Sequence, residues 1–432
     1  MDQVDLLGIG LGPANLSLAA LAESAGSLRT SFLESKPEFR WHSGIMLPSA
    51  QLQVSYLKDL VTLVDPTSRF SFLNYLAHNG RIFRSLVANG TSCSRQEFED
   101  YYRWAAGQLS SVRWNSEVRE VSVRGDSFEV ATADGTVTRT RNLVLGSGRK
   151  PSVPSFAQPL VGRSILHGSD ILRANPETKG KKVLVVGAGQ SGAEIVNYLL
   201  TDGGLPSSLT WISSRVGFLP IDDSPFTNEW FAPPYVDYFQ GLTGDRRAEL
   251  LSHQRLASDG ISESLLRSIY RRLYDLDLAR SGLRHQLLTS RRMVDLAPDG
   301  DRYTSTLHDA DGNRLERCDA DVVIFCTGYS SAAPAYLEPL RQRLLNRQGE
   351  FEVQGDYSLS WDGPPGLRVY VQNAAEATHG IADPNLSLAS WRSARILNSV
   401  LGEDLYRLDR VTSTVTWESV PDRDRDGDLI AP

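Results

Sequence analysis

Near the start of the chain stands Val4-Asp5-Leu6-Leu7-Gly8-Ile9-Gly10-Leu11-Gly12-Pro13, a short apolar run that ends in closely spaced glycines. Residues 14–21 continue mostly with Ala, Leu and Ser, a composition typical of a helix. Residues 30–33 form a second short strand-like run, which is followed by Glu34. This order predicts a strand, a tight turn, a helix and a second strand, the β-α-β unit of a nucleotide-binding fold.

The glycines of this first unit indicate a dinucleotide site. Gly8 and Gly10 correspond to the first two glycines of the fingerprint, which permit the tight turn and the close approach of a pyrophosphate to a helix N-terminus. Gly12 and Pro13 open the helix, and Glu34 is placed to accept a hydrogen bond from a ribose hydroxyl. A purely structural turn is the alternative interpretation.

A second unit repeats the pattern in residues 182–194. Gly187-Ala188-Gly189-Gln190-Ser191-Gly192 is a full G-x-G-x-x-G sequence, and we assign Gly187, Gly189, Gln190 and Ser191 to cofactor contacts. The next strand-like run ends in Ser213-Ser214-Arg215, where an NAD-specific fold would carry Asp or Glu. Arg215 suits a 2'-phosphate, although it could also be an ordinary solvated arginine. We therefore expect NADPH in this second unit and FAD in the first.

The remaining patterns predict the organisation of the chain. Residues 117–148 read as a β-meander followed by a buried strand, and residues 244–285 are largely helical. Residues 320–329 form an apolar strand that ends at a glycine; we expect it to rejoin the first sheet and assign Thr327, Gly328 and Tyr329 to cofactor contacts. The predicted fold class is α/β, with two nested Rossmann-like dinucleotide-binding domains and a smaller, largely helical substrate region. The expected segments are a first FAD-binding part at 1–160, an NADPH-binding domain at 161–320 with a helical insertion at about 225–290, a second FAD-binding part at 321–402, and a C-terminal tail at 403–432 whose residues 421–428 we expect to be disordered.

Composition excludes several classes of protein. The 432 residues include 45 Lys and Arg against 52 Asp and Glu, and this net charge of −7 disfavours binding to nucleic acid or to an anionic membrane. No apolar run approaches the length of a membrane span. Cys93, Cys318 and Cys326 form no CxxC and no metal-ligand pattern, so we expect no metal site. A small-molecule enzyme of the reducing cytoplasm is the natural interpretation.

Two dinucleotides in nested folds indicate a flavoprotein oxidoreductase. A flavin disulfide reductase needs a redox-active cysteine pair, which this sequence lacks. A flavin monooxygenase needs no protein nucleophile, because the reduced flavin and O2 generate the oxidant. The monooxygenase class is therefore the one consistent with the sequence.

Several long segments resemble the N-hydroxylating flavin monooxygenases, the lysine and ornithine side-chain amine hydroxylases of siderophore-type pathways. The resemblance covers nearly the whole chain and is strongest in residues 39–46, 52–62, 65–68, 223–229, 258–262 and 377–388. It implies N-hydroxylation of the side-chain amine of a free amino acid with FAD, NADPH and O2, through a C(4a)-hydroperoxyflavin. The form Ser258-Asp259-Gly260-Ile261-Ser262 resembles the lysine and diamine branches, so L-lysine is the expected substrate, with ornithine or a diamine (putrescine or cadaverine) as alternatives. The resemblance also implies a homo-oligomer, a tetramer or a dimer.

The resemblance assigns roles to individual residues. Lys58 matches the lysine that pairs with the substrate's α-carboxylate, and Ser387 matches a residue near the reacting amine and the flavin. The other matching positions are Trp41, His42, Gln53 and Leu386 at the cofactor, and Gln53, Asn228 and Asp259 at the substrate.

Each of these roles has a simpler alternative. Lys58 could be a solvated lysine, and Trp41 could belong to the core without touching flavin. His42, His379 and Cys326 are assigned no catalytic role, and no general base is evident. A flavin reductase without oxygenation, and a flavin-binding protein without turnover, remain as functional alternatives.

Overall fold

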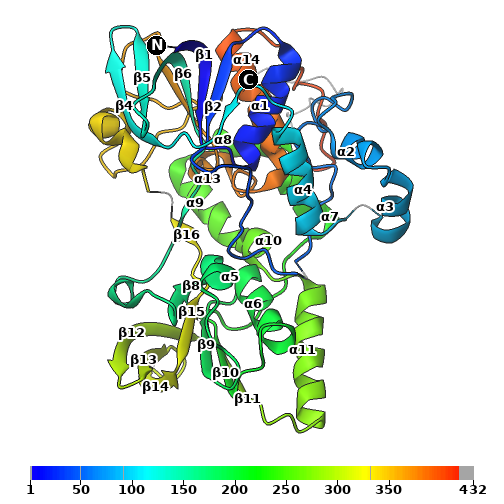
Figure 1. Ribbon diagram of the computed structural model, residues 1–432, viewed down its shortest axis with the longest axis vertical. Helices are drawn as coiled ribbons and strands as arrows, with labels where there is room; N and C mark the ends of the chain where they lie inside the picture. The colour runs from blue at the N-terminus through cyan, green and yellow to red at the C-terminus, as the bar shows by residue number, and fades with distance from the viewer. Residues whose placement is uncertain (1, 49, 91, 331, 418–432) are drawn as a thin grey trace, which may run out of the picture.

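The computed structural model describes residues 2–48, 50–90, 92–330 and 332–417. Two parallel sheets form two lobes that lie one above the other in Figure 1, and each lobe contains one of the glycine turns. The chain enters the upper lobe, crosses to the lower lobe, and returns to the upper lobe for its last strand and last long helix. The predicted nesting of one α/β unit within another is confirmed.

The first sheet has seven strands in the order β3-β2-β1-β6-β5-β4, with β17 also paired to β6. Strands β3, β2, β1, β6 and β17 are parallel, whereas β4, β5 and the first half of β6 form the predicted antiparallel meander. The third meander strand and the predicted buried strand are one continuous strand. The strands span β1 Asp2–Ile9, β2 Thr30–Leu33, β3 Val112–Arg113, β4 Val118–Arg124, β5 Ser127–Thr132, β6 Val137–Leu145 and β17 Arg368–Val371.

Helix α1 (Pro13–Ala25) is the centre of the upper lobe. Nine consecutive residues, 14–22, are buried, because α14 (Ala389–Leu401) and α4 (Arg95–Ala106) pack against the helix in addition to the sheet. A helix buried on all sides needs the mostly small and apolar sequence found here. Two further helices, α2 (Phe72–His78) and α3 (Ile82–Asn89), extend from this lobe beside α4 (Figure 1).

The second sheet has five parallel strands in the order β11-β10-β9-β15-β8. Helix α6 (Gln190–Thr201) follows β9, and a three-stranded antiparallel sheet, β12-β13-β14, adjoins β9 through β14. The strands span β8 Ile165–His167, β9 Lys182–Val186, β10 Ser208–Ile212, β11 Arg284–Leu288, β12 Arg291–Asp299, β13 Arg302–Asp309, β14 Arg314–Ala320 and β15 Val322–Phe325.

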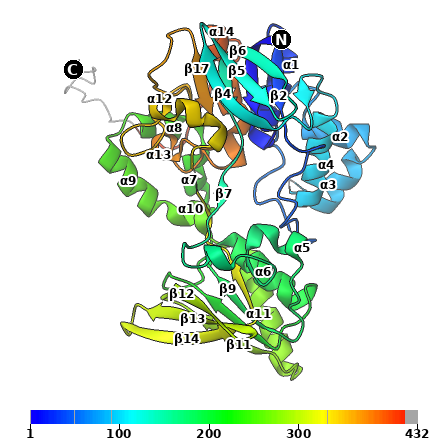
Figure 2. The same cartoon turned by 60° about the vertical axis from the view of Figure 1, so that its left-hand side comes forward.

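One expectation about strand placement is wrong. The strand at 320–329 does not rejoin the first sheet, because β15 pairs with β9 on one side and with β8 on the other. The strand that returns to the first sheet is β17, which pairs with β6. Between the lobes, β16 (Tyr329–Ser330) pairs with β7 (Lys150–Pro151), a two-stranded connection visible in Figure 2. The return to the first sheet therefore comes later than residue 321.

The helices expected at about 225–290 are present, but they divide between the lobes. Helices α8 and α9 contact α13 of the upper lobe, whereas α11 packs on α6 of the lower lobe. Ile269, Leu273 and Leu276 form the buried stripe of α11 at helical spacing. The helices span α7 Pro225–Asn228, α8 Pro233–Gln240, α9 Gly244–His253, α10 Arg255–Asp259 and α11 Glu263–Leu278, and the short remaining ones are α5 Ile171–Ala174, α12 Arg341–Leu344, α13 Glu376–His379 and the 3-10 turns Gln158–Leu160, Gly168–Asp170, Glu229–Phe231, Ala335–Leu340 and Leu386–Leu388.

The first part of the expected C-terminal tail packs on the body of the protein. The Tyr406 hydroxyl donates to the Leu21 carbonyl at 2.8 Å, and the Trp417 ring lies 4.7 Å from the Tyr235 ring. The segment 421–428, which we expect to be disordered, lies outside the described residues. Across the described parts of the chain, no helix is long and apolar enough to cross a membrane, and no cluster of His, Cys, Asp and Glu could hold a metal ion.

Candidate active site

The first glycine turn has the geometry of a pyrophosphate site. Gly10 has φ of +82°, and a Cβ on it would lie 2.7 Å from the Gly146 carbonyl oxygen, so only glycine fits where the turn crosses β6. Gly12 caps α1 without a side-chain partner, Pro13 occupies the first turn, and no atom lies within 4 Å of a Cβ on Gly12. The N-terminus of α1 thus presents free backbone N–H groups to open space, and a phosphate fits there.

Glu34 closes this turn from the end of β2. The carboxylate is 5% exposed; its Oε2 accepts from the Leu11 N–H at 2.8 Å, and its Oε1 accepts from the Lys36 N–H at 3.0 Å and from the Ser35 hydroxyl at 3.1 Å. A carboxylate has about four acceptor positions, so a ribose hydroxyl can still bind. The residues of the first unit fit an FAD.

The segment after β2 mixes core and surface positions. Trp41 is 9% exposed, its backbone N–H donates to Glu99 Oε1 at 2.8 Å, and its ring lies edge-on to Tyr102 at 5.4 Å. The side chains of His42 and Gln53 are exposed. Trp41 therefore has the packing expected of a core residue.

Lys58 and Ser387, two residues assigned to the substrate, are in direct contact. Lys58 Nζ donates to Ser387 Oγ at 2.8 Å, and Ser387 in turn donates to Asn385 Oδ1 through both its hydroxyl (2.8 Å) and its backbone N–H (2.9 Å). Lys58 is half-buried, and burial lowers its pKa. Among the described residues no carboxylate pairs with Lys58. A desolvated cation without a counter-ion is suited to binding an anion.

Both sides of this contact are anchored on α1. The Ser17 hydroxyl donates to the Leu60 carbonyl at 2.6 Å, which holds the segment that carries Lys58. On the other side, the Ala14 carbonyl accepts from Gln372 Nε2 at 3.3 Å, and α14, which follows Ser387, packs along α1. The pair therefore lies beside the helix whose N-terminus receives the pyrophosphate.

Among the described residues, no hydrogen bond joins Asn228 to the Lys58–Ser387 pair. Asn228 ends α7, is exposed, and donates through Nδ2 to the Asp223 carbonyl at 2.8 Å. Leu386 is half-buried on the first core, next to Ser387. The roles of Asn228, Leu386 and Gln53 remain predictions.

The second glycine turn lines a cavity of about 420 Å³. The cavity unites residues from α6 and α10, from the segments that follow β9, β10 and β15, and from the end of β8 with the turn after it. Ile45, which packs in the core of the lower lobe, also lines it. Its lining includes every residue predicted to bind NADPH and the three assigned to cofactor contacts after β15: Gly187, Gly189, Gln190, Ser191, Arg215, Thr327, Gly328 and Tyr329. Because β15 belongs to the second sheet, the last three face the NADPH cavity.

Glycine geometry in this unit also fits a dinucleotide. A Cβ on Gly187 would lie 2.3 Å from the Cys326 carbonyl oxygen, and one on Gly192 would lie 2.2 Å from the Gly187 carbonyl oxygen. On Gly189, which caps α6 without a side chain, the nearest atom would be 3.8 Å away. Gly187 and Gly192 permit close backbone packing, whereas Gly189 leaves room for a phosphate at the helix N-terminus.

Two arginines make the far end of the cavity suitable for a 2'-phosphate. Arg215 and Arg255 both donate to Asp259 Oδ2 at 3.3 Å, and Arg215 also donates to the Asp259 backbone carbonyl at 3.1 Å. Burial and the neighbouring Arg255 lower the pKa of Arg215. Two cations around one carboxylate leave a net positive charge, and Ser213 and Ser214 also line the cavity.

Asp259 is thus found with the NADPH residues and not with the Lys58–Ser387 pair. Its placement reflects the helix α10 that it ends, which brings it next to Gly189 and Arg215. Arg255 and His167 also line the cavity, although neither was predicted from the sequence to bind a cofactor. Arg255 stands one helical turn before Asp259, at ion-pair spacing, and this is the one local signal that indicates it.

An ion pair between a half-buried arginine and a buried glutamate joins the two lobes beside this cavity. Arg95 of α4 makes a two-pronged contact with Glu194 of α6, at 2.9 and 2.6 Å, and Gln190 Nε2 also donates to Glu194 at 2.9 Å. Gln190 Oε1 accepts from the Ser262 N–H at 2.9 Å. One network therefore connects the upper lobe, the NADPH turn and the start of α11.

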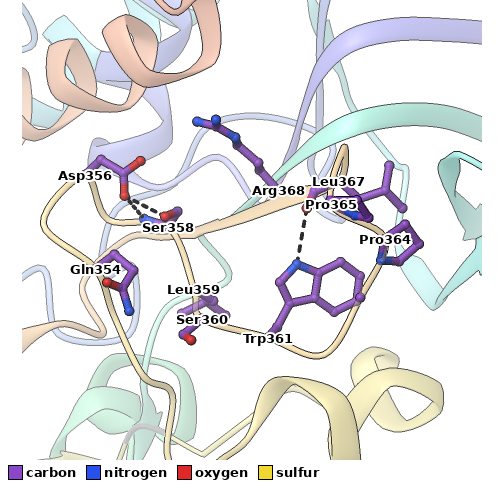
Figure 3. A pocket seen from close by; sticks show the side chains of 11 residues that line it. Gln354, Asp356, Ser358, Leu359, Ser360, Trp361, Pro364, Pro365, Leu367 and Arg368 are labelled. Carbon is purple, nitrogen blue, oxygen red and sulfur yellow. Dashed lines mark hydrogen bonds between the residues drawn. The ribbon is translucent and has the colours of Figure 1, made fainter.

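A second hollow of about 470 Å³ lies in the upper lobe, among the loops before β17 (Figure 3). Trp361 Nε1 donates to the Leu367 carbonyl at 3.2 Å across it, and Asp356 accepts from the Ser358 N–H at 3.0 Å. None of the predicted site residues lines this hollow. We assign it no role in the chemistry.

Two dinucleotide sites on nested α/β units, with free cysteines, define a flavoprotein oxidoreductase that is not a disulfide reductase. Burial raises the pKa of Cys326, the cysteine at the NADPH cavity, to about 12, which makes it a poor nucleophile. The sequence profile of the L-lysine 6-monooxygenase/L-ornithine 5-monooxygenase family matches residues 2–331, and the chain belongs to this family.

Individual relatives agree with this assignment. The L-lysine N6-monooxygenase of Escherichia coli is 38% identical over 422 residues, which cover 96% of this chain and 99% of that protein. The FAD-bound cadaverine monooxygenase DfoA of the desferrioxamine pathway of Erwinia amylovora superposes with a TM-score of 0.91 at 32% identity, covering 98% of this chain and 100% of that one. The ornithine N-hydroxylase KtzI of Kutzneria sp. 744, solved with reduced FAD, NADP+ and L-ornithine, has a TM-score of 0.85 at 31% identity, covering 93% and 99%.

These comparisons confirm the predicted fold class, the flavin N-monooxygenase activity, the cofactors FAD and NADPH, and the association with siderophore biosynthesis. The relatives differ in the amine that they hydroxylate. The individual substrate is therefore not decided by similarity.

Proposed function

We propose that the protein hydroxylates the side-chain amine of L-lysine and forms N6-hydroxylysine. The observation that carries this proposal is Lys58, a half-buried cation that contacts Ser387 and pairs with no carboxylate among the described residues. A free amino acid differs from its decarboxylated diamine by one carboxylate. A site that binds this group should offer a cation, whereas a diamine site should avoid a lysine opposite a second ammonium.

The cofactors and the chain have separate tasks in this reaction. Bound FAD supplies the chemistry that activates O2, with reducing equivalents from NADPH. The N-terminus of α1 and Glu34 hold FAD, and the cavity with Arg215 and Arg255 holds NADPH. Lys58 holds the substrate carboxylate, and Ser387 orients Lys58 through the 2.8 Å contact.

The amine must be neutral when it reacts. A free lysine amine has a pKa of about 10.4, so almost all of it is protonated near pH 7. Removal of water disfavours the charged form of an amine, as it does for Lys58, whose pKa burial lowers. We infer that the same desolvation favours the neutral substrate amine, and we assign no side chain as a general base.

A diamine is the second candidate. The observation that favours it is the high structural similarity to the cadaverine monooxygenase, with a TM-score of 0.91. Ornithine is a weaker candidate, since it differs from lysine by one methylene, which a pocket distinguishes by about 1 to 3 kcal/mol. The carboxylate preference implied by Lys58 is what leads us to place lysine before cadaverine.

Replacement of Lys58 by Ala tests the proposal. We expect KM for lysine to rise at least about tenfold, because a charge-assisted contact is lost, while the rate of flavin reduction by NADPH stays unchanged. For cadaverine, which has no carboxylate, KM should stay the same or fall. If the unaltered protein prefers cadaverine, or if Lys58→Ala leaves lysine kinetics unchanged, the carboxylate role of Lys58 must be abandoned.

Two further expectations accompany this function. We infer a homo-oligomer, a tetramer or a dimer, from the family resemblance, and a cytoplasmic location from the cysteine usage of the sequence. Light scattering of the purified protein measures the first, and cell fractionation measures the second. NADPH oxidation without any hydroxylated amine would instead support a flavin reductase.

A further inference from the structure

The turn that carries Ser387 is closed by a buried ion pair. Arg392, in the first turn of α14, and Asp383 are each 1% exposed. Arg392 Nη1 donates to Asp383 Oδ1 at 2.8 Å and to the Asp383 backbone carbonyl at 2.5 Å. Ser387 lies between these two residues in the chain, so the pair fixes both ends of the segment that contacts Lys58.

The rest of the Arg392 guanidinium ties this turn to the end of β17. Its Nε donates to Gln372 Oε1 at 2.5 Å, and its Nη2 donates to Asn373 Oδ1 at 2.8 Å. Gln372 continues the network to the Ala14 carbonyl at 3.3 Å, in the first turn of α1. One side chain thus relates the Ser387 turn to the helix whose N-terminus receives the FAD pyrophosphate.

The same network holds backbone conformations that side chains rarely adopt. Asn373, which accepts from Arg392, has φ of +58°, and Tyr357, whose ring centroid lies 5.8 Å from the guanidinium carbon, has φ of +66°. Asp383 Oδ2 also accepts from the Ala375 N–H at 2.8 Å. Such conformations persist only where the surroundings determine them, and they concentrate at functional sites.

A buried ion pair is weak evidence for stability, because desolvation offsets its attraction and a well-packed apolar pair is often as stable. The four hydrogen bonds that Arg392 donates do determine the geometry of the turn, since a guanidinium is a planar, rigid donor. We propose that Arg392 is a positioning residue for the substrate site: through Asp383 it holds the 383–387 turn so that Ser387 contacts Lys58. The proposal rests on the proposed function, because it concerns the same substrate contact.

Four variants test the role of Arg392. Arg392→Gln removes the charge, and Arg392→Lys keeps the charge without the planar fork. Asn373→Gly removes one acceptor at a position whose φ suits glycine, so it should fold even if the Arg392 variants do not. Ile396→Ala is the matched control, because Ile396 is a fully buried apolar residue of α14 in the first hydrophobic core and makes no hydrogen bond through its side chain, so we expect the substitution to lower stability alone.

The measurements separate position from stability. Lysine binding to the oxidised, FAD-loaded protein is measured by calorimetry without turnover, and the ratio of hydroxylated product to NADPH consumed is measured separately, with FAD content and Tm recorded for each variant. We expect Arg392→Gln and Arg392→Lys to weaken lysine binding about tenfold and to lower the product ratio, and Asn373→Gly to act in the same direction with a smaller change. Ile396→Ala should lower Tm and leave both quantities unchanged.

Two results overturn the proposal. One is an Arg392→Lys or Asn373→Gly protein that binds lysine and couples NADPH to product as the unaltered protein does. The other is an Ile396→Ala control that loses binding and coupling to the same extent as the Arg392 variants. If the unaltered protein hydroxylates no amine, the proposed function has failed. If it hydroxylates an amine and one of these two overturning results is obtained, only the role of Arg392 has failed.

Discussion

Replacement of Arg215 by Ala is expected to weaken NADPH binding and to leave NADH binding nearly unchanged. Arg215 is 22% exposed, lines the NADPH cavity, and lies beside Arg255, with Asp259 Oδ2 at 3.3 Å from both. NADPH differs from NADH by the 2'-phosphate alone. A variant that affects only the contact with this group should therefore separate the two nucleotides.

The magnitude follows from the contacts. A hydrogen bond to a charged group contributes about 1.5 to 3 kcal/mol, and about 1.4 kcal/mol corresponds to a tenfold change in affinity. Because Arg255 remains as a second cation, we expect the low end of this range. KM for NADPH should rise about 10- to 30-fold, whereas KM for NADH should change by less than about twofold.

Steady-state oxidation of both nucleotides, together with anaerobic flavin reduction in a stopped-flow instrument, measures these changes. Arg267→Ala is a suitable control, because Arg267 lies on α11, is 78% exposed and pairs with Glu263 one turn away. Exposed pairs of this kind contribute little. An equal loss with NADPH and NADH in the Arg215 variant would refute its assignment to the 2'-phosphate.

Asp259→Asn tests the same cluster with the opposite sign. The substitution removes an anion from the phosphate site, while the 3.1 Å bond from Arg215 to the Asp259 backbone carbonyl remains to orient the guanidinium. KM for NADPH should fall about two- to fivefold, and KM for lysine should not change. A change in KM for lysine alone would return Asp259 to the substrate site.

Burial lowers the pKa of Lys58, so its ammonium is present below this lowered pKa and is lost as the pH rises through it. In a pH series, KM for lysine should therefore begin to rise at a lower pH than it would with a lysine of ordinary pKa. Lys58→Arg, whose side chain stays charged, should remove that rise. The Gly10→Val protein should purify with little FAD, because its Cβ would lie 2.7 Å from a carbonyl oxygen. The Gly189→Val protein should keep FAD, and its rate of flavin reduction by NADPH should fall at least about tenfold. If absorbance spectra showed FAD in the Gly10 variant and none in the Gly189 variant, the assignment of the two sites would be reversed. Arg95→Met should lower the free energy of unfolding in urea by about 1 to 3 kcal/mol, because the buried Glu194 carboxylate loses its cationic partner and keeps only the hydrogen bond from Gln190. The double substitution with Glu194→Met should recover most of the loss, and no recovery would contradict this explanation.

The glycine turns were predictable because their geometry is local. A turn with φ of +82° at Gly10 and a close backbone approach at Gly187 can be made by few residues other than glycine, so the constraint is visible in a few consecutive positions. The absence of a carboxylate before Arg215 is equally local. These local features were enough to predict the order of strands and helices in each unit and to predict FAD in the first unit and NADPH in the second.

Strand partners were less predictable. Residues 322–325 and 368–371 are both short, apolar and fully or largely buried, and nothing in either run specifies the sheet that it joins. The run that contains residues 322–325 was expected to rejoin the first sheet, although β17 does so. Pairing depends on the packing of the whole domain, which a four-residue pattern does not encode.

The candidate site was only partly predictable, because its contacts join residues that are far apart in the sequence. Lys58 and Ser387 are 329 positions apart, and their 2.8 Å contact was foreseen as two separate roles and not as a pair. Asp259 was assigned to the substrate from a short matching segment, but it is the last residue of α10 and lies beside Arg215. The role of Arg392 depends on three-dimensional neighbours alone, whereas Arg255 has one local signal, its spacing of four residues from Asp259.

The most direct test of the proposed function is product formation with four amines under identical conditions. The purified protein, loaded with FAD and supplied with NADPH and O2, is offered lysine, ornithine, putrescine or cadaverine, and NADPH consumption and hydroxylated amine are measured together. We predict the highest kcat/KM for lysine, with nearly one N6-hydroxylysine formed for each NADPH consumed. A higher kcat/KM for cadaverine or putrescine, or NADPH consumption without any hydroxylated amine, would contradict the assignment.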